Sequence, residues 1–355
     1  MPAKYAQFAE MLETRIRRGD YALREMPTEQ GLANEIGVSR MTARRAMLEL
    51  VDRGVIVRKP YGRITVNPDR FKSRTLRLAL LTPSHPASQY QKWSHSTERV
   101  AYAAKALVQA VNYAHWDDPI IGRSLSSFDG VFIVATSEPM PARVRTMLSK
   151  AGNVVALDSD WTDMAVPSIR MMRPEFVHQL GDHLRKLGHT SIDCLNAQPG
   201  RGIIDDLIEQ WSLWKSLNHV QGKIINEPVE PHTLSVTGAY HTMKRVLKEG
   251  RFNATCVLCL TSAVATGAIR ALHESGRVTG RDVSVACIDS NNNTTAYETP
   301  SRTCLITPMP DKFVGIAVRW FYDGKGQWKH PMLLEPASAE LFEGESTVAV
   351  APDEP

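Results

Sequence analysis

The sequence predicts a mixed α/β protein with a small, mainly helical N-terminal domain and a larger domain of parallel sheets flanked by helices. Residues 1–67 contain three amphipathic helical patterns followed by two short apolar runs. Beyond residue 75, short apolar runs alternate with helical patterns as far as residue 322, which is typical of parallel strands joined by helical crossovers. That length exceeds one ordinary sheet, so we expect two lobes.

The bulk composition indicates a globular protein of more than one domain. The chain has 355 residues, of which 43% are hydrophobic and 23% charged, as in ordinary globular proteins. No stretch approaches the roughly 20 apolar residues that span a bilayer. The N-terminus lacks the apolar core of a signal peptide. We therefore expect a cytoplasmic protein with no membrane partner.

Five cysteines lie in apolar, strand-like runs: Cys194, Cys256, Cys259, Cys287 and Cys304. Cys256 and Cys259 form a C-x-x-C, a pattern found in redox and zinc sites. The surrounding residues 254–260 have the character of a buried strand, where cysteine behaves as a small hydrophobe, and no second ligand pair completes a zinc site. We predict core cysteines, no metal and no cofactor.

The charge is unevenly distributed along the chain. The whole chain has a formal net charge of +4, yet residues 1–75 alone carry +6 and the remainder −2. A basic segment attached to a near-neutral body is typical of a phosphate-binding module. The N-terminal domain is therefore a candidate for binding nucleic acid.

The N-terminal helices have the spacing of a helix-turn-helix. An amphipathic pattern covers residues 5–16, and Thr28 is a candidate N-cap for a short helix that ends at Ile36 before Gly37. Ser39 then caps a third helix from residue 40 to about 53. Its inward stripe is formed by Ala43, Ala46, Met47 and Leu50. A short helix, a glycine turn and a second helix form the DNA-binding motif.

The outward face of the third helix carries candidate DNA contacts, namely Arg40, Thr42, Arg44 and Arg45. Arginine pairs bidentately with guanine in the major groove, and hydroxyls suit phosphate. Two apolar runs at 55–57 and 64–66 bracket a basic tip at 58–63, which predicts a hairpin that lies on the DNA backbone or in a minor groove. The alternative is a structural three-helix domain with a solvated basic face.

Residues 21–66 resemble the GntR family of winged helix-turn-helix proteins. The resemblance is carried by Met26-Pro27-Thr28-Glu29, Leu32-Ala33, Gly37-Val38-Ser39-Arg40-x-Thr42-x-Arg44-x-Ala46-x-x-x-Leu50, Gly54-Val55-Ile56 and Gly62. It implies DNA contacts at Arg40, Thr42 and Arg44, with Ser39 on phosphate and Gly62 in the wing. Gln30 stands where many members carry a DNA-contacting arginine. The complete predicted DNA-binding set is Ser39, Arg40, Thr42, Arg44, Arg45, Arg58, Lys59, Gly62 and Arg63.

A polar segment at 68–75 is the predicted linker, and the alternating pattern follows it. We expect strands at 76–82, 131–136, 153–158, 191–195, 254–260, 283–289 and 303–307. We expect helices at 97–114, 140–151, 174–187, 204–217, 236–249, 262–275 and 311–322. Domains are predicted at 1–67 (DNA-binding), 76–345 (effector-binding and dimerisation) and 346–355 (tail), and residues 346–350 are a candidate late strand.

Ligands of such folds bind beyond the carboxyl ends of the strands, so the polar residues that follow each run are candidate contacts. They are Ser84 and His85 with Gln89, Tyr90 and Trp93; Asp158 with Trp161; Asn196; Thr261 and Ser262; and Asp289 with Asn291. Tryptophan, carboxylate and amide groups together suit a sugar, whose ring stacks on aromatics and whose hydroxyls need acceptors and donors.

This part resembles the sensor domain of LacI/GalR repressors, which has a periplasmic-binding-protein-like fold. The matching stretches are residues 128–133, 154–158, Leu184-x-x-Leu187-Gly188-His189-x-x-Ile192, Ala265-x-Gly267-Ala268 and 282–289. The resemblance implies effector contacts at Asp158 and Asp289. The predicted effector-binding set is Ser84, Gln89, Tyr90, Trp93, Asp158, Trp161, Gln210, Asp289 and Asn291.

The sequence departs from this family at several positions. Gln210 replaces a usual arginine of the binding cleft, Thr261-Ser262 replaces Asn-Asp, and Thr307 replaces a frequent glutamine. Residues 97–130 also look short, with 112–116 where a second strand and helix belong. Loss of a bidentate arginine removes a main anchor for sugar hydroxyls.

The predicted function is that of a homodimeric transcription repressor. Its affinity for a double-stranded DNA operator would be modulated by a small molecule, a sugar in the first instance, bound between the lobes. The alternative is a dimeric DNA-binding regulator whose cleft no longer binds a ligand. We do not expect an enzyme, because the chain has no G-x-G-x-x-G, P-loop, G-x-S-x-G or H-E-x-x-H motif.

Overall fold

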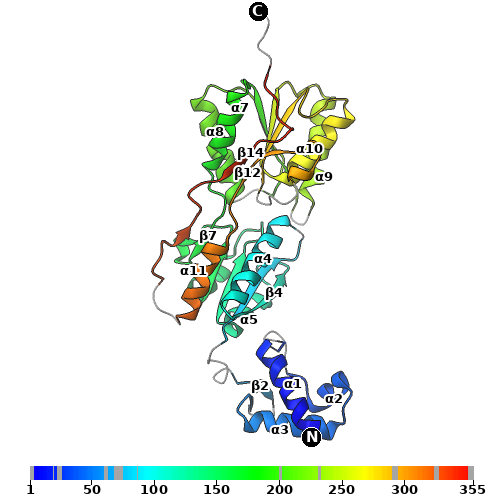
Figure 1. Cartoon of the computed structure of the whole chain (residues 1–355), viewed down its shortest axis with the longest axis vertical. Coiled ribbons are helices and arrows are strands. Elements are labelled where there is room, and N and C mark those ends of the chain that lie inside the picture. Colours follow the sequence, from blue (N-terminus) through cyan, green and yellow to red (C-terminus); the bar gives the residue numbers. More distant parts are fainter. Residues whose placement is uncertain are drawn as a thin grey trace, which may run out of the picture.

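The computed structural model describes residues 4–18, 20–21, 26–59, 63–67, 75–85, 87–199, 202–230, 233–289, 295–323 and 328–350. The chain forms three parts that follow one another along the long axis of the molecule: an N-terminal head, a first lobe and a second lobe (Figure 1). The two-lobed α/β architecture expected from the sequence is confirmed. Within the described residues, no helix is both long and apolar enough to cross a membrane.

The head has the predicted winged helix-turn-helix order. Its elements are α1 (Lys4–Arg18), α2 (Glu29–Ile36), α3 (Arg40–Asp52) and the antiparallel hairpin of β1 (Ile56–Arg58) and β2 (Ile64–Val66). The Thr28 hydroxyl accepts a hydrogen bond from the Gly31 amide and caps α2, and Gly37 ends this helix in the left-handed region at φ 73°. The predicted stripe of α3 is buried against α1 and α2 in a single core.

The first lobe is a six-stranded parallel sheet with helices on both faces. Its strands are β3 (Arg77–Pro83), β4 (Leu107–Tyr113), β5 (Gly130–Val134), β6 (Val154–Leu157), β7 (Ser168–Ile169) and β13 (Leu333–Leu334), in the order β13-β7-β6-β5-β3-β4. One face is covered by α4 (Ser88–Ala103) and α11 (Asp311–Tyr322), and the other by α5 (Pro119–Ser127) and α6 (Ala142–Ala151).

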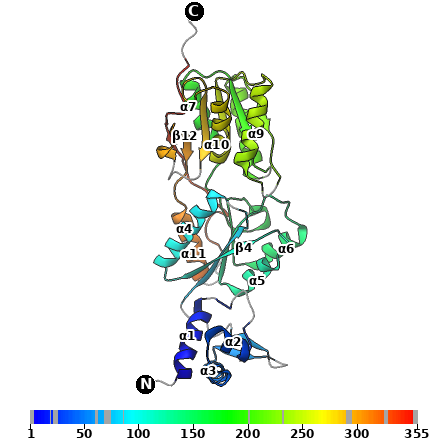
Figure 2. The ribbon, with the colours of Figure 1, turned by 90° about the vertical axis from the view of Figure 1, so that its right-hand side faces the viewer.

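The second lobe repeats this plan with one antiparallel edge. Its strands are β8 (Ile192–Asn196), β9 (Ile224–Asn226), β10 (Cys256–Cys259), β11 (Ser284–Asp289), β12 (Thr303–Ile306) and β14 (Glu340–Phe342), in the order β14-β12-β11-β10-β8-β9, with β14 antiparallel to β12. The helices α7 (Phe176–Lys186) and α8 (Ile203–Leu217) cover one face. The helices α9 (Ser235–Lys248) and α10 (Ser262–Glu274) cover the other (Figure 2).

The chain passes between the lobes three times. It leaves the first lobe after β7, returns after β12 to form α11 and β13, and leaves again to form β14. The crossing segments are 170–175, 307–310 and 335–339. Each lobe is therefore completed by residues that arrive from the other.

All seven predicted strands are present, but two local expectations are wrong. Residues 97–114 do not form one helix: α4 ends at Ala103, and 107–113 form the edge strand β4, followed by α5. The second strand and helix that looked absent are therefore present. Along β4 only Val111 and Tyr113 are fully buried. The hydrophobic pattern of this strand therefore resembles the last turns of an amphipathic helix.

The end of the described chain also differs from expectation. Residues 346–350 are not a strand; the late strand is β14. Ser346 is buried, its hydroxyl donates to the Val285 carbonyl at 2.6 Å, and its backbone carbonyl accepts from the Val285 amide. The segment that was predicted to begin a tail is thus hydrogen-bonded to the second lobe, whereas residues 351–355 lie outside the described part, as do residues 68–74 of the predicted linker.

The five cysteines are free and buried, as predicted. Cys256 and Cys259 belong to opposite faces of the second sheet, because they are three residues apart on one strand. They therefore cannot act as a pair. Among the described residues no cluster of His, Cys, Asp or Glu has the arrangement of a metal site.

The packing of α11 on the first sheet generates a prediction about stability. A Cβ at Gly130 would overlap the buried ring of Phe321 on α11. We expect Gly130→Ala to lower the free energy of unfolding by about 1–3 kcal/mol, because overpacking forces the neighbours to shift. Urea denaturation measures it. The control is Gly122→Ala in α5, where the new methyl group meets only the Met147 sulfur at 3.5 Å; equal losses in both variants would contradict the packing argument.

Candidate functional site

The recognition helix is fixed at its N-terminus by its own cap. The Thr42 amide donates to the Ser39 hydroxyl at 3.2 Å, and the two hydroxyl oxygens lie 2.8 Å apart. This satisfies one of the free amides of the first turn. Ser39 is exposed and Thr42 half-buried, so both hydroxyls lie at the protein surface in front of a helix N-terminus, which attracts phosphate.

Arginine side chains surround this N-terminus. Arg40, Arg44 and Arg45 are exposed on α3, and Arg58 is exposed on the hairpin. Glu29 lies between helix and hairpin, with a carboxylate oxygen 3.9 Å from Arg40 and the other 3.9 Å from Arg58. Such loose, solvated ion pairs are weak. Glu29 therefore holds Arg40 and Arg58 near each other, but its weak ion pairs leave both side chains able to bind a polyanion.

The hairpin and α3 lie at the end of the molecule remote from the second lobe (Figure 1). Lys59 directly follows β1 and Arg63 directly precedes β2, and both side chains are exposed. The Lys59 amide donates to the Arg63 carbonyl at 2.7 Å. Gly62, predicted to contact DNA in the wing, lies outside the described residues. The structure thus brings the other eight predicted DNA contacts to α3 and the hairpin of one head.

A second group of predicted residues meets at the carboxyl ends of β3 and β6 in the first lobe. The Trp93 indole of α4 donates to the Asp158 carboxylate at 2.5 Å. Asp158 follows β6 with φ 52°, a backbone conformation that is costly outside glycine. Burial raises the pKa of Asp158 from 3.8 to about 6, while the Trp93 hydrogen bond and the charge of Lys92 oppose the rise.

Tyr90 stands beside this carboxylate. Its hydroxyl lies 2.9 Å from His85 Nε2, and the two rings meet edge to face. Burial, reinforced by the charge of Asp158, raises the pKa of Tyr90 well above its usual value. Ser84 and Gln89 are exposed on the same stretch of chain. The tyrosine therefore remains a neutral hydroxyl next to an acceptor carboxylate.

Lys92 was missed by the sequence analysis. It is only 6% exposed, and its Nζ donates to the Thr307 carbonyl at 3.1 Å and to the Thr307 hydroxyl at 2.9 Å. Thr307 belongs to the second crossing segment and stands where the family frequently has glutamine. A lysine next to the predicted Trp93 was the available signal, but surface lysines are too common for it to stand out. We call Tyr90, Lys92, Trp93, Asp158 and Thr307 the interlobe group.

Other predicted effector contacts are not placed in this group. Trp161 is buried in the opposite layer of the first lobe, 6.0 Å from the Trp116 ring, so its placement is that of a core residue. Gln210 is half-buried on α8, and its carbonyl lies 3.0 Å from His178 Nε2. The Asp289 side chain and Asn291 fall outside the described part of the chain.

In the second lobe the polar residues after the strands bond to one another. The Asn196 side-chain amide donates to Asn226 at 2.8 Å, and the Gln198 side chain donates to the Thr261 hydroxyl at 3.0 Å. Arg302, also missed, is 3% exposed and donates to the Ser262 carbonyl at 2.7 Å. The Thr261-Ser262 pair that departs from the family thus caps α10 and holds a buried arginine.

One ion-pair network links the lobes directly. Arg170, in the first crossing segment, lies 2.6 Å from Glu335 in the third segment and 3.4 Å from Asp206 on α8. Burial raises the pKa of Asp206, and the charge of Arg170 opposes the rise. Arg170 and Glu335 thus connect the first and third crossing segments, and Asp206 connects both to the N-terminal part of α8.

The comparisons with known proteins agree with this architecture. The family model for bacterial regulatory proteins of the gntR family matches residues 4–66, and that for periplasmic binding proteins and the sugar-binding domain of the LacI family matches residues 125–309, just over half of the chain. Among proteins of curated function, none matches the chain in sequence.

Solved structures of LacI-type proteins share the fold. A LacI family transcriptional regulator from Enterococcus faecium with bound ribose has a TM-score of 0.65 and 18% identity over 78% of this chain and 100% of its own. The lac repressor dimer bound to operator and the anti-inducer ONPF has a TM-score of 0.63 and 17% identity over 78% and 96%. The lac repressor bound to ONPG has a TM-score of 0.62 and 17% identity over 93% and 95%.

The head and the two-lobed body together define a DNA-binding transcription regulator. The chain belongs to the LacI-type periplasmic binding protein family and carries a gntR-family head.

The half-buried Asp158 generates a pH prediction. Because its pKa rises from 3.8 to about 6 on folding, the native state holds the proton more tightly than the unfolded chain. Its contribution is complete below about pH 4 and is lost as the pH rises to about 6. We expect wild type to lose on the order of 2 kcal/mol of unfolding free energy relative to Asp158→Asn across this window. Urea melts at several pH values measure it; a constant difference would contradict the shift.

Proposed function

We propose that this protein is a homodimeric repressor whose operator affinity changes when a sugar binds between its lobes. One observation carries the proposal: a single chain combines a head and a sensor. The head has exposed arginines around the capped N-terminus of α3, and the sensor has the half-buried carboxylate of Asp158 at the carboxyl ends of its strands. A single head contacts too little DNA for specificity, and two-fold operators suit two-fold proteins.

The proposed DNA interface has base-reading and backbone-binding parts. Arg40 and Arg44, on α3, would read bases in the major groove. Ser39, Thr42 and Arg45 would bind phosphate near the helix N-terminus, while the hairpin residues Arg58, Lys59, Gly62 and Arg63 would bind the adjacent backbone or minor groove. The exposed, weakly paired state of Arg40 and Arg58 supports this assignment.

The proposed effector site centres on Asp158. Its carboxylate, held by the Trp93 indole, offers two acceptor oxygens to vicinal hydroxyls, and Tyr90 adds a ring and a hydroxyl. Trp93 is almost fully buried, so it would orient Asp158 and leave stacking to Tyr90. Ser84 and Gln89 would extend the site in the first lobe, with Gln210, Asp289 and Asn291 facing it from the second. The Enterococcus faecium neighbour is described with bound ribose.

A second candidate function is a DNA-binding dimer whose sensor binds no small molecule. It is favoured by the internal pairing of the polar groups at the strand ends: Lys92 bonds to Thr307, and Gln198 bonds to Thr261. A group that is already satisfied gains less from a ligand. This candidate predicts an operator affinity that is indifferent to sugars.

The DNA-reading assignment can be tested with matched arginines. Arg40→Ala and Arg44→Ala should each weaken binding to a selected operator by about 1–3 kcal/mol, because each removes a base contact. The control is Arg143→Ala on α6, whose side chain is 68% exposed against 67% for Arg40. Fluorescence anisotropy with labelled duplex measures the affinity. Arginine variants that bind like the control would overturn the assignment.

The effector assignment can be tested by thermal shift against mono- and disaccharides and their phosphates. A sugar that binds the native state at a hundred times its Kd should stabilise it by about 2.7 kcal/mol and raise the melting temperature. Asp158→Ala should abolish this rise while operator binding is retained. A flat response across the panel would favour the ligand-free alternative, and an unchanged rise in the variant would place the sugar elsewhere.

A further inference from the structure

The second crossing segment and the start of α11 are held along one side of α4. Lys92, Ser96 and Arg99 follow one another at intervals of four and three residues, so they share one side of this helix. Lys92 Nζ donates to the carbonyl and hydroxyl oxygens of Thr307 at 3.1 and 2.9 Å. The Arg99 Nε and the Ser96 hydroxyl donate to the Asp311 carboxylate at 2.6 and 3.3 Å. The segment is therefore fixed to the first lobe at both of its ends.

The sequence of this segment makes it stiff. Thr307 is followed by Pro308-Met309-Pro310, and each proline fixes its own φ and restricts the residue before it. A rotation of the second lobe is therefore absorbed most readily at the junction between the end of β12, at Ile306, and Thr307. The bonds from Lys92 to Thr307 hold this junction on the first lobe.

The same lysine acts on the carboxyl group at the centre of the proposed effector site. Burial raises the pKa of Asp158 to about 6, and the positive charge of Lys92 opposes this rise. The next residue along α4, Trp93, donates its indole N–H to Asp158 at 2.5 Å. Two consecutive residues of α4 thus lie between the proposed effector site and the second crossing segment.

Burial makes Lys92 sensitive to both neighbours. Its side chain is 6% exposed, and a buried ammonium group is stable only where acceptors and an opposite charge replace water. The Thr307 oxygens are acceptors, and the ionised Asp158 carboxylate is an opposite charge. A change in the charge at Asp158 therefore changes how firmly Lys92 holds Thr307, because electrostatic effects are strong where water is excluded.

We propose that Lys92 transmits effector binding from Asp158 to the second crossing segment. This role rests on the proposed function, in which Asp158 binds a sugar. Sugar hydroxyls that donate to Asp158 keep its carboxyl group ionised. The ionised carboxylate draws the Lys92 ammonium group toward itself and weakens its bonds to Thr307, so the junction after β12 is released and the lobes rotate. Lys92 is a positioning residue, because in this role it contacts no sugar.

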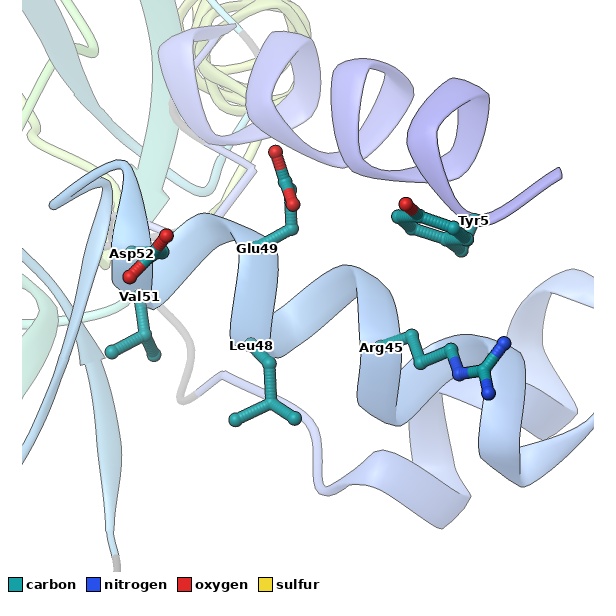
Figure 3. Close-up of a pocket in the computed structure, with 6 residues that line it drawn as sticks. All are labelled: Tyr5, Arg45, Leu48, Glu49, Val51 and Asp52. Carbon is teal, nitrogen blue, oxygen red and sulfur yellow. The ribbon is translucent and has the colours of Figure 1, made fainter. Parts of the chain in front are cut away.

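The head contains a hollow that offers a competing route. It has a volume of about 450 Å³, is bordered by α1 and α3 (Figure 3), and is lined by Tyr5, Arg45, Leu48, Glu49, Val51 and Asp52. A sugar bound in this hollow would act on the recognition helix directly, without passing through the crossing segments. Substitutions at Thr307 and Lys92 separate the two routes, because both positions lie in the sensor.

Two substitutions at one position test the route through Lys92. Thr307→Val removes the hydroxyl that accepts from Lys92 and keeps the shape of the side chain, whereas Thr307→Ser retains a hydroxyl. Fluorescence anisotropy gives the operator Kd with and without a saturating sugar from the thermal-shift panel, beginning with ribose. We expect the sugar to change the operator Kd of wild type and of Thr307→Ser by factors that agree within about twofold. In Thr307→Val the factor should be at least about threefold smaller, because a hydrogen bond to a charged group is lost.

Two further variants extend the test. Lys92→Met removes the whole contact with Thr307, so a sugar that saturates this variant should change its operator Kd by less than about twofold. The control is Ser96→Ala, which removes a hydrogen bond from the same side of α4 to Asp311 and leaves Thr307 in place. This control should keep the factor of the wild type.

The outcomes separate this route from the proposed function. If a sugar changes the operator Kd of wild type and Thr307→Val and Lys92→Met keep the full factor, the role of Lys92 is overturned and the sugar response stands. If Ser96→Ala loses the factor as well, any loosening of the segment suffices and the specific role of Thr307 is overturned. If no sugar of the panel changes the operator Kd of wild type, the proposed sugar response fails, and the role of Lys92 fails with it.

Discussion

The structure depends on a topological constraint: the chain crosses between the two lobes three times, at 170–175, 307–310 and 335–339. The first lobe receives α11 and β13 only after the second sheet has received β12, and the second lobe receives β14 last. Neither lobe is complete without the other. Any change in the angle between the lobes must be absorbed by these three segments, which also supply Thr307 to the interlobe group and Arg170 and Glu335 to the ion-pair network.

Buried polar contacts at the crossings limit the arrangements that the lobes can adopt. The Lys92 ammonium group loses its water on burial, and two hydrogen bonds to Thr307 replace the lost contacts with water. Arg170 forms ion pairs with both Glu335 and Asp206. An unpaired charge at either place would cost several kcal/mol. The lobes therefore have few alternative packings, as the proposed switching between discrete states by a ligand requires.

Sequence patterns predicted the elements but not the contacts between distant ones. The capped α3, the helix-turn-helix core and the seven central strands follow from local periodicity and cap residues such as Thr28 and Ser39. The edge strand β4 was not predicted because only two of its seven side chains are buried, so the alternation of a strand could not be distinguished from the end of α4. Lys92 and Arg302 were missed because their roles arise from partners far away in the chain, which spacing cannot reveal. Trp161 followed the strand-end rule, yet it packs inward on Trp116.

In the proposed function the sensor and the head are coupled, and coupling between two binding equilibria is reciprocal. The most direct measurement is the Kd of a sensor ligand in the presence and absence of a saturating operator duplex, by isothermal titration calorimetry. We expect a change of about 5–150-fold, equal to the factor by which the same ligand changes the operator Kd. A ligand that binds with the same Kd to the free and the DNA-bound protein would contradict it.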